Sequence, residues 1–167
     1  MKEGKRDMKI KIYTMGGTID KIYFDRKSTY EVGESNISEI LKEANVNLEY
    51  EISSLLHKDS LDMTDEDRQL IFDRISSDEH RHIVVTHGTD TMILTAKKLK
   101  AVRDKVIVLT GAMEPARFKR SDAVFNIGAA IAAVQALNPG AYIAMNGRIF
   151  DPDRTRKNLE RNWFEDL

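Results

Sequence analysis

Three short, mainly apolar segments, each followed closely by threonine and glycine, constrain the fold of this chain more than any other feature. The first is residues 9–15, followed by Gly16-Gly17-Thr18. The others are residues 83–86 and 106–109, followed by His-Gly-Thr-Asp and Thr-Gly-Ala-Met. Short apolar runs bounded by glycine are typical of buried strands, and glycine adopts backbone angles closed to other residues. Because parallel sheets bind ligands at the carboxyl ends of their strands, we expect three loops to meet at one sheet edge.

Helical patterns alternate with these strands along the chain. The predicted helices cover residues 34–44, a stretch beginning at Thr64, residues 91–100 and residues 122–137, and the further strands cover residues 48–52 and 141–145. Thr64 with Asp67, and Asn36 with Glu39, have the spacing of helix-capping pairs. This alternation predicts an α/β fold with a doubly wound, mostly parallel sheet, helices on both faces and a single domain.

Two segments do not follow the strand–helix pattern. Residues 21–33 mix aromatic and charged side chains without helical period, which indicates a hairpin or a mobile flap. After the last predicted strand, Asn146-Gly147 is a strong turn signal. The charged tail over residues 148–167 follows, with Trp163 and Phe164 near its end.

The charge balance argues against a nucleic-acid or membrane binder. Lysine and arginine total 26 and aspartate and glutamate 27, so the net charge is −1 and there is no basic excess. The chain has no cysteine, which excludes disulfides and a thiolate nucleophile. Its first residues are charged rather than apolar, unlike a secretion signal, and no apolar stretch is long enough to cross a bilayer. We therefore expect a cytoplasmic protein.

Cofactor and metal sites are not expected either. Gly16-Gly17 extends neither to the dinucleotide-binding G-x-G-x-x-G pattern nor to the phosphate loop that ends in Gly-Lys-Ser/Thr. His80 and His82 flank the start of a strand, while His57 and His87 stand alone, which is a poor ligand set for a metal ion.

Hydroxyl groups remain as the reactive side chains. Thr18, Ser60, Thr89 and Thr110 would gather at one sheet edge, with Asp90 and Tyr30 nearby. A threonine hydroxyl becomes a useful nucleophile when a neighbouring group takes its proton. For a single loop, the simpler reading is that threonine caps a helix and glycine forms a corner. Three such loops on one edge favour a catalytic interpretation.

The residues that form these loops resemble the signature stretches of the bacterial-type L-asparaginases and glutaminases. The resemblance is carried by Thr14-Met-Gly-Gly-Thr-Ile-Asp20, Thr86-His-Gly-Thr-Asp-Thr-Met92, Leu109-Thr-Gly-Ala-Met113 and Ser121-Asp-Ala-Val-Phe-Asn126. It covers essentially the whole chain and corresponds to that family's amino-terminal, catalytic domain. The expected domain is therefore residues 1–167, without a second domain.

The resemblance implies a role for each site residue. Thr18 would be the nucleophile, Tyr30 the flap tyrosine that hydrogen-bonds it, and Thr89, Asp90 and Lys157 a second proton-handling group. The α-carboxylate of the substrate would bind to Ser60, and the ammonium group to Asp90.

The remaining substrate-binding positions implied by the resemblance are backbone groups. Gly17, Gly88 and Ala112 would line the substrate site, and the Thr89 N–H would help to stabilise the oxyanion. The implied reaction is hydrolysis of L-asparagine to L-aspartate and ammonia through a threonine acyl-enzyme, without a cofactor. A homodimer or larger homo-oligomer is expected by the same resemblance.

Two departures from the family pattern leave other functions open. The two-domain enzymes use an acidic residue from a neighbouring subunit's second domain, and no residue here is assigned that role. Leu61 stands where many relatives carry glutamine beside the binding serine. The alternatives are a binding or regulatory domain with little activity, or hydrolysis of glutamine, a lysophospholipid ester or an amide on a larger molecule.

Overall fold

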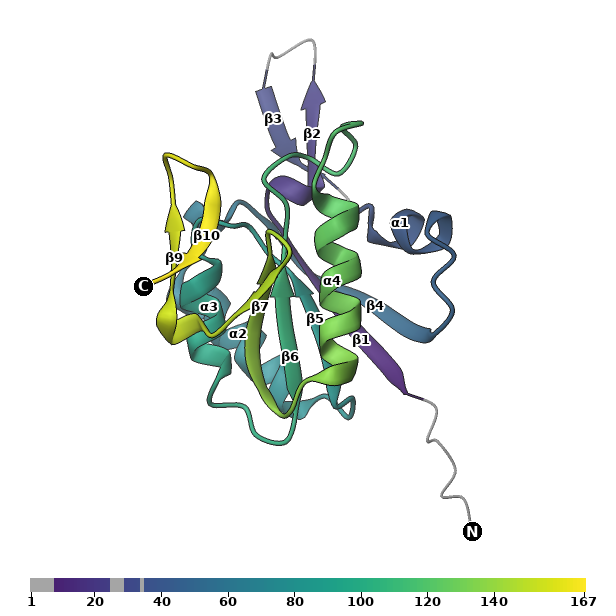
Figure 1. Ribbon diagram of the computed structural model, residues 1–167, viewed down its shortest axis with the longest axis vertical. Helices are drawn as coiled ribbons and strands as arrows, with labels where there is room; N and C mark the ends of the chain where they lie inside the picture. The colour runs from purple at the N-terminus through teal and green to yellow at the C-terminus, as the bar shows by residue number, and fades with distance from the viewer. Residues whose placement is uncertain (1–7, 25–28, 34) are drawn as a thin grey trace.

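A computed structural model describes residues 8–24, 29–33 and 35–167, and its centre is a mostly parallel sheet (Figure 1). The strands of this sheet are β1 (Lys9–Gly16), β4 (Glu49–Lys58), β5 (His82–Thr86), β6 (Val106–Thr110), β7 (Gly140–Met145) and β8 (Arg148–Phe150). The helices are α1 (Ile37–Glu43), α2 (Asp65–Ser77), α3 (Met92–Leu99) and α4 (Ala123–Ala136), with short 3-10 turns η1 (Thr18–Asp20), η2 (Ser60–Asp62) and η3 (Pro152–Arg154).

The strand order places the site-bearing loops next to one another. The order is β4-β1-β5-β6-β7-β8, with β8 antiparallel to β7 and the other neighbours parallel. From β1 the chain first goes to β4 on one side and then returns to β5 on the other, so the order reverses between β1 and β5. Such a reversal opens a crevice at the carboxyl ends of the two strands. Thr14 of β1 pairs with Thr86 of β5, which brings the two loops to the same level.

Helices cover both faces of the sheet, as the sequence predicts. One apolar core joins α2 and α3 to the sheet through residues such as Ile71, Met92 and Ile107. The other joins α1 and α4 through residues such as Ile40 and Ile127. Alternate strand residues supply the two cores, because successive side chains of a strand point to opposite faces. The predicted doubly wound α/β fold is confirmed.

Helix starts follow the predictions at some positions and depart from them at others. Thr64 and Asp67 form the predicted capping box, in which each side chain accepts a hydrogen bond from the backbone N–H of the other residue. The predicted pair of Asn36 with Glu39 is wrong, because Asn36 makes no side-chain capping bond. Within the described residues, α1 is also shorter than predicted and begins at Ile37.

Strand lengths and the tail differ from the predictions as well. β4 runs on to Lys58, beyond the predicted end near residue 52, and it lies at the edge of the sheet. The predicted turn at Asn146-Gly147 is confirmed: both residues have positive φ, 53° and 74°, and they join β7 to β8. The charged tail contains the hairpin of β9 (Thr155–Asn158) and β10 (Trp163–Asp166), which the sequence pattern does not predict.

The segment after the first strand forms a hairpin, one of the two predicted alternatives. Its strands β2 (Lys21–Phe24) and β3 (Thr29–Val32) pair with each other as a separate two-stranded sheet, which we call the flap hairpin. In Figure 1 it projects beyond the carboxyl ends of the central strands. None of the described helices is long and apolar enough to span a membrane.

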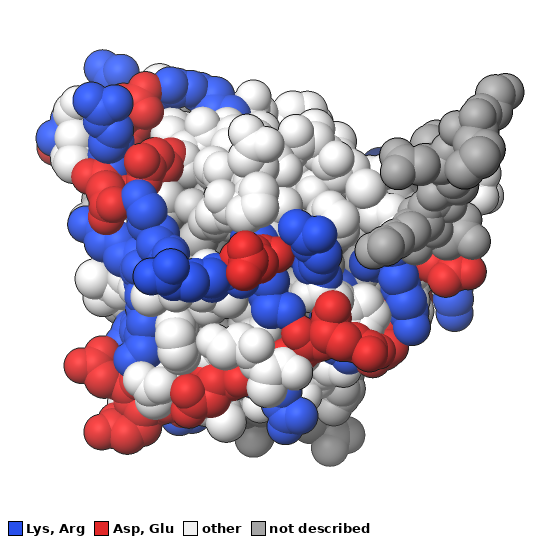
Figure 2. Space-filling model, turned by 90° about the horizontal axis from the view of Figure 1, so that it is seen from below, with Lys and Arg blue, Asp and Glu red and all other residues white. Residues whose placement is uncertain are grey.

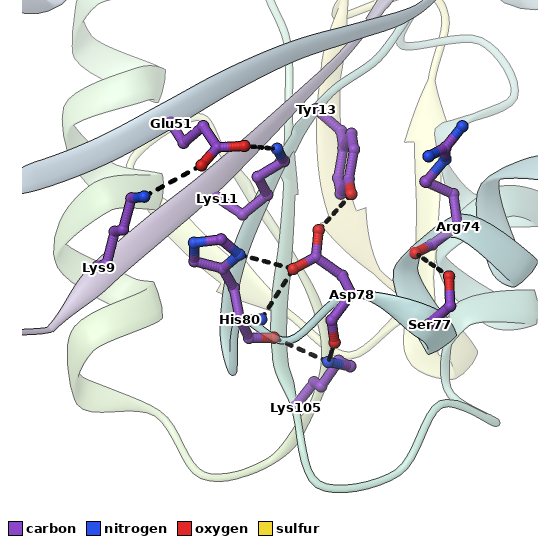
Figure 3. Close-up of polar contacts among 9 residues, drawn as sticks. All are labelled: Lys9, Lys11, Tyr13, Glu51, Arg74, Ser77, Asp78, His80 and Lys105. Atoms are coloured by element: carbon purple, nitrogen blue, oxygen red, sulfur yellow. Dashed lines mark hydrogen bonds and ion pairs between the residues drawn. The ribbon is translucent and has the colours of Figure 1, made fainter.

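A polar network closes the opposite, amino-terminal edge of the sheet (Figure 3). The Asp78 carboxylate accepts hydrogen bonds from the Tyr13 hydroxyl and from the backbone and ring of His80, while Lys105 donates to the Asp78 and His80 carbonyls. Burial alone would raise the pKa of Asp78, but the bonds from Tyr13 and His80 outweigh it and hold the pKa below its usual value. The network thus fixes the turn that leads into β5.

Charged side chains of both signs surround this amino-terminal edge, which faces the viewer in Figure 2. A cavity of about 630 Å³ lies here, bordered by side chains that include Lys9, His80, Arg81 and Asp104. The cavity lies at the opposite edge of the sheet from the loops with the predicted site residues.

Candidate active site

Three loops meet at the carboxyl edge of the sheet, in contact through glycine. Gly17 has φ 90°, and a Cβ atom built on it would lie 2.4 Å from the Gly88 Cα. A Cβ atom on Gly88 would lie 2.6 Å from the Ser60 Cβ and Oγ. Only glycine allows backbones to approach this closely. The loops after β1 and β5 and the turn after β4 therefore share one small region.

Thr18 lies in the first of these loops, at the start of the 3-10 turn η1. The turn is closed by a hydrogen bond from the Asp20 N–H to the Gly17 carbonyl, 3.1 Å long. Its middle residue, Ile19, accepts a hydrogen bond from the Ala116 N–H, so the loop after β6 also contacts it. Thr18 is half-buried, whereas its neighbours Ile19 and Asp20 are buried. Its hydroxyl thus stands on a turn fixed from both sides.

Lys157 reaches the loop after β5 from the far end of the sequence. Its Nζ donates to the Thr89 Oγ1 at 2.8 Å and to an Asp90 carboxylate oxygen at 2.6 Å. The Thr89 side chain is buried and that of Lys157 is 12% exposed. A lysine in this position can exchange a proton with the threonine hydroxyl, while the carboxylate fixes its orientation.

The β9–β10 hairpin brings Lys157 to this position. Lys157 pairs with Phe164 in that hairpin, and the Phe164 N–H donates to the Asn146 side chain at 2.8 Å. Because Asn146 follows β7 directly, this bond ties the hairpin to the carboxyl edge of the sheet. Phe164 is buried beside Phe150, with ring centres 6.3 Å apart.

Ser60 is buried beside Gly88, with its hydroxyl free of partners among the described residues. Asp59 caps the turn by accepting from the Leu61 N–H, and the Ser60 carbonyl accepts from the Thr91 hydroxyl at 2.7 Å. An unpaired buried hydroxyl costs free energy that a bound acceptor would recover. Leu61 itself is 71% exposed.

Ala112 is fully buried, and its loop is fixed by the first turn of α4. Asp122 accepts from the Met113 and Glu114 N–H groups, and the Asn126 side chain donates to the Gly111 carbonyl at 3.0 Å. The sequence pattern predicts Asp122 as the start of a helix. It does precede α4, but its side chain makes no capping bond to that helix and instead binds the loop.

His87 is the first residue of the loop after β5 and contacts both that loop and α3, and sequence reasoning gave it no role. Its Nδ1 is 2.7 Å from the Gly88 carbonyl and its Nε2 is 2.8 Å from the Thr95 hydroxyl. Full burial lowers its pKa to about 4, so the ring is neutral near pH 7. A neutral ring can donate from Nδ1 and accept at Nε2, which satisfies both contacts.

The structure does not place the side chains of two predicted residues, Thr110 and Tyr30, at the site. Thr110 is not available to the site, because its buried hydroxyl donates to the Ala144 carbonyl at 2.8 Å within the sheet. Tyr30 lies in β3, paired with Tyr23, and its side chain is outside the described residues. The chemical roles of Thr18, Tyr30 and Lys157 stay predictions. In the described part of the chain, no cluster of three or more histidine or carboxylate side chains is arranged to hold a metal ion.

Comparisons with known proteins agree with this geometry. A family model described as "Asparaginase, N-terminal" matches residues 9–163. The glutaminase-asparaginase of Acinetobacter glutaminasificans is 42% identical over 73 residues, which are 41% of this chain and 22% of that protein. One component of the glutamyl-tRNA(Gln) amidotransferase of Methanococcus vannielii is 44% identical over 71 residues, 41% of this chain and 17% of that component.

Solved structures extend the likeness to the whole fold. A probable cytoplasmic L-asparaginase from Campylobacter jejuni matches with a TM-score of 0.81 at 28% identity, over 95% of this chain. The match covers 53% of that structure, so the chain spans about half its length.

Proposed function

Because the chain belongs to the asparaginase family, we propose that it is an amidohydrolase that converts L-asparagine to L-aspartate and ammonia. The observation that carries the proposal is the contact of Lys157 with Thr89 and Asp90, beside the loop that holds Thr18. Nucleophile, proton-transfer group and backbone donors at one edge are the parts that amide hydrolysis needs.

In the proposed first half-reaction, the Thr18 Oγ1 attacks the side-chain carbonyl carbon of asparagine. Tyr30 takes part in moving the hydroxyl proton, and the carbonyl oxygen becomes an oxyanion near the Thr89 N–H. The C–N bond then breaks, the nitrogen takes up a proton through the Thr89–Asp90–Lys157 group, and ammonia leaves. An ester between Thr18 and the aspartyl group remains.

Water completes the proposed reaction. The same proton-handling group takes a proton from water, whose oxygen attacks the ester carbon. The bond to Thr18 breaks, Thr18 recovers its proton, and L-aspartate is released. Burial of Thr89 and the small exposure of Lys157 support proton transfer out of contact with bulk water.

Substrate binding in this proposal uses the glycine-lined region between the loops. Ser60 binds the α-carboxylate, because its buried hydroxyl has no other partner among the described residues. Asp90 binds the ammonium group, and Gly17, Gly88 and Ala112 shape the walls. Glutamine is the alternative substrate, since one relative is a glutaminase-asparaginase.

The domain, location and assembly are part of the same proposal. Residues 1–167 act as the catalytic domain in the cytoplasm, as the name of the Campylobacter jejuni relative suggests for that protein.

A homodimer or larger homo-oligomer is supported by α4, which carries no charged residue and exposes Val124 and Phe125. An apolar groove of about 300 Å³ between α4 and Ile149 continues this surface. The face that α4 covers is at the top of Figure 2, where the surface shows an uncharged area. Light scattering measures the molar mass of wild type and of Phe125→Asp in solution and so tests this assembly. A dimer that forms through α4 is expected to dissociate in the variant.

The direct test is ammonia release by the purified chain. Wild type is expected to release ammonia from asparagine, and Thr18→Ala to lose turnover by orders of magnitude with an unchanged circular dichroism spectrum. Thr18→Ser is the matched control, because it keeps the hydroxyl. Normal turnover in Thr18→Ala would remove this residue from the mechanism.

A second candidate is hydrolysis of an amide on a larger molecule. The match to an amidotransferase component and the exposed Leu61 beside Ser60 favour it. A panel of asparagine, glutamine, peptidyl amides and esters separates the two candidates. Binding of aspartate or asparagine in calorimetry without any ammonia release would instead indicate a binding or regulatory domain.

A further inference from the structure

The β9–β10 hairpin, which carries Lys157, needs support from the rest of the protein. Its two strands pair only with each other, as a separate two-stranded sheet. A two-stranded hairpin alone is marginally stable in water. Contacts with the body of the protein must therefore decide where the Lys157 ammonium group lies relative to Thr89 and Asp90.

The pairing of the two strands turns the Phe164 N–H away from β9. In an antiparallel pair, opposed residues that exchange backbone hydrogen bonds alternate with opposed residues that do not. At the open end of the hairpin, the Leu167 N–H donates to the Arg154 carbonyl at 2.9 Å, so these two residues form a hydrogen-bonded pair. Lys157 and Phe164 are the third pair along from there and so belong to the other kind. The Phe164 N–H consequently points out of the hairpin.

The Asn146 side chain accepts this outward N–H. Its Oδ1 atom is 2.8 Å from the Phe164 nitrogen. Asn146 is the first residue of the turn that joins β7 to β8, and its φ of 53° lies in the left-handed region. Asparagine adopts that conformation more readily than most residues. One residue thus forms the turn and binds the outer edge of β10.

The bond from Phe164 acts at the point of β10 that lies directly opposite Lys157. In a pair without backbone hydrogen bonds the two Cα atoms are about 4.5 Å apart, and the side chains lie on the same face. The Phe164 ring is buried beside Phe150, while Lys157 reaches Thr89. A shift of β10 at Phe164 is therefore passed on to Lys157.

Other contacts hold the ends of the hairpin rather than its middle. The Thr155 hydroxyl, at the start of β9, donates to the Asp151 carbonyl at 2.5 Å. Arg148 forms an ion pair with Asp166 at the end of β10, but both side chains are more than half exposed, and such pairs contribute little. In the described part of the chain, the bond to Asn146 is the one hydrogen bond between the middle of β10 and the β7–β8 turn.

We propose that Asn146 is a positioning residue, which holds β10 through the Phe164 N–H and so places Lys157. Without this bond, the ammonium group should spend less time in contact with Thr89 and Asp90. The turn after β7 would then act on the site although it supplies no group to the substrate. The consequence for turnover rests on the proposed function, whereas the placing of Lys157 does not.

Chemical labelling of lysine tests the placing without any substrate. Asn146→Gly removes the acceptor and keeps a residue that tolerates positive φ. Reductive methylation of Lys157, followed by mass spectrometry, should be about tenfold faster in this variant than in wild type. Exchange of the Phe164 amide hydrogen should rise by a similar factor. The buried Lys105, at the opposite edge of the sheet, should be labelled at the wild-type rate, which distinguishes a local change from general unfolding.

Two variants separate the bond from the turn. Asn146→Asp keeps an acceptor and a residue that tolerates the left-handed region, so it should label Lys157 as wild type does. Asn162→Gly is the matched control, because it makes the same substitution at another asparagine with a φ of 52°, in the turn between β9 and β10. It should leave the labelling of Lys157 unchanged.

Unchanged labelling of Lys157 in a folded Asn146→Gly would overturn the proposal. An equal increase in Asn162→Gly would also overturn it, because the cause would then be a looser turn rather than the lost bond. If Asn146→Gly does not fold, Asn146→Ser takes its place, since the serine hydroxyl is one bond closer to the backbone. Faster labelling of Lys157 but not of Lys105 supports the proposal there, and unchanged labelling overturns it.

Ammonia release then separates this proposal from the proposed function. If wild type is active, Asn146→Gly should lower kcat about tenfold with little change in KM, and Asn146→Asp should recover most of the loss. In the Lys157→Met background, Asn146→Gly should have no further effect on kcat, because the group that it places is already gone. A further tenfold loss in that background would show that Asn146 acts on the reaction by another route. If wild type releases no ammonia from any amide, the labelling result still decides whether Asn146 places Lys157.

Discussion

The backbone of Gly17 lies directly against that of Gly88, so that the loops after β1 and β5 touch where the strand order reverses. A methyl group on Gly17 would come within 2.4 Å of both the Cα and the N of Gly88. The contact leaves room for two chains only where neither carries a side chain. This contact between backbones places the Thr18 turn next to Thr89 and Asp90.

Gly17→Ala should therefore separate the two loops. The added methyl meets backbone rather than a movable side chain, and the φ of 90° is itself unfavourable for alanine. We expect a loss of stability of about 2–4 kcal/mol and loss of any ammonia release. Thermal unfolding and the ammonia assay measure both.

Gly128→Ala is the matched control for this substitution. Nothing lies within 4 Å of a Cβ atom built on Gly128, in the middle of α4. Alanine should stabilise the helix there by about 0.5–1 kcal/mol and leave activity unchanged. Equal stability of Gly17→Ala and wild type would refute the close approach of the two loops.

Lys157→Met should abolish most of the turnover and leave the fold intact. The substitution removes the ammonium group that contacts Thr89 and Asp90 but keeps a similar length of side chain. A lost proton-transfer group costs at least about 100-fold in kcat. Lys97→Met, on the exposed side of α3, is the control, and comparable activity in both variants would exclude Lys157 from the chemistry.

His87 should make the protein less stable as the pH falls from about 6.5 to about 4. In the unfolded chain the ring binds a proton near its usual pKa of 6.5, whereas in the folded chain burial lowers the pKa to about 4. The unfolded state therefore binds more protons across this window, and up to about 3 kcal/mol of stability is lost on acidification. Denaturant unfolding at several pH values gives the free energy of unfolding as a function of pH. In this window, that free energy should change less steeply with pH in His87→Gln than in wild type. An identical slope in both proteins contradicts a neutral buried ring.

Asp78→Asn should destabilise the protein at neutral pH and less so in acid. The folded pKa of Asp78 is below its usual value of 3.8, so its contribution is present above that value and is lost as the pH falls through the folded pKa. We expect a loss of about 1–3 kcal/mol at pH 7 from the weakened bonds to Tyr13 and His80. Asp104→Asn, an exposed position near the same edge, should change stability by less than about 0.5 kcal/mol. If the free energies of unfolding of Asp78→Asn and wild type differ by the same amount at every pH, the result would argue against this network.

The features that could be predicted from the sequence are those with a local cause. Apolar runs such as residues 83–86 define strands, and Thr64 and Asp67 bond each other within one helical turn. The Asn146-Gly147 turn follows from the readiness of these two residues to adopt positive φ. The strand–helix alternation then predicts a parallel sheet whose carboxyl edge gathers the loops.

What could not be predicted depends on contacts between distant segments. Asp122 reads as a helix start, yet its carboxylate binds the loop at Met113. Thr110 has the same Thr-Gly context as the other loops, yet its hydroxyl faces the Ala144 carbonyl of the neighbouring strand. The residues 53–58 of β4 form an edge strand that buries too little to show a clear apolar pattern. For Asp20, nothing local in the sequence indicates burial.

The interior position of β1, between β4 and β5, has a consequence for how the chain assembles during synthesis. β1 leaves the ribosome first, but its partners β4 and β5 begin only at Glu49 and His82. Pairing over such separations is slow, because the intervening chain must be closed into a loop before the contacts form. The first strand therefore waits unpaired, and its alternating lysines at positions 9 and 11 favour solubility during that interval. Substitutions in the glycine contact should then speed unfolding more than they slow folding, since the two loops meet only after the sheet is in register.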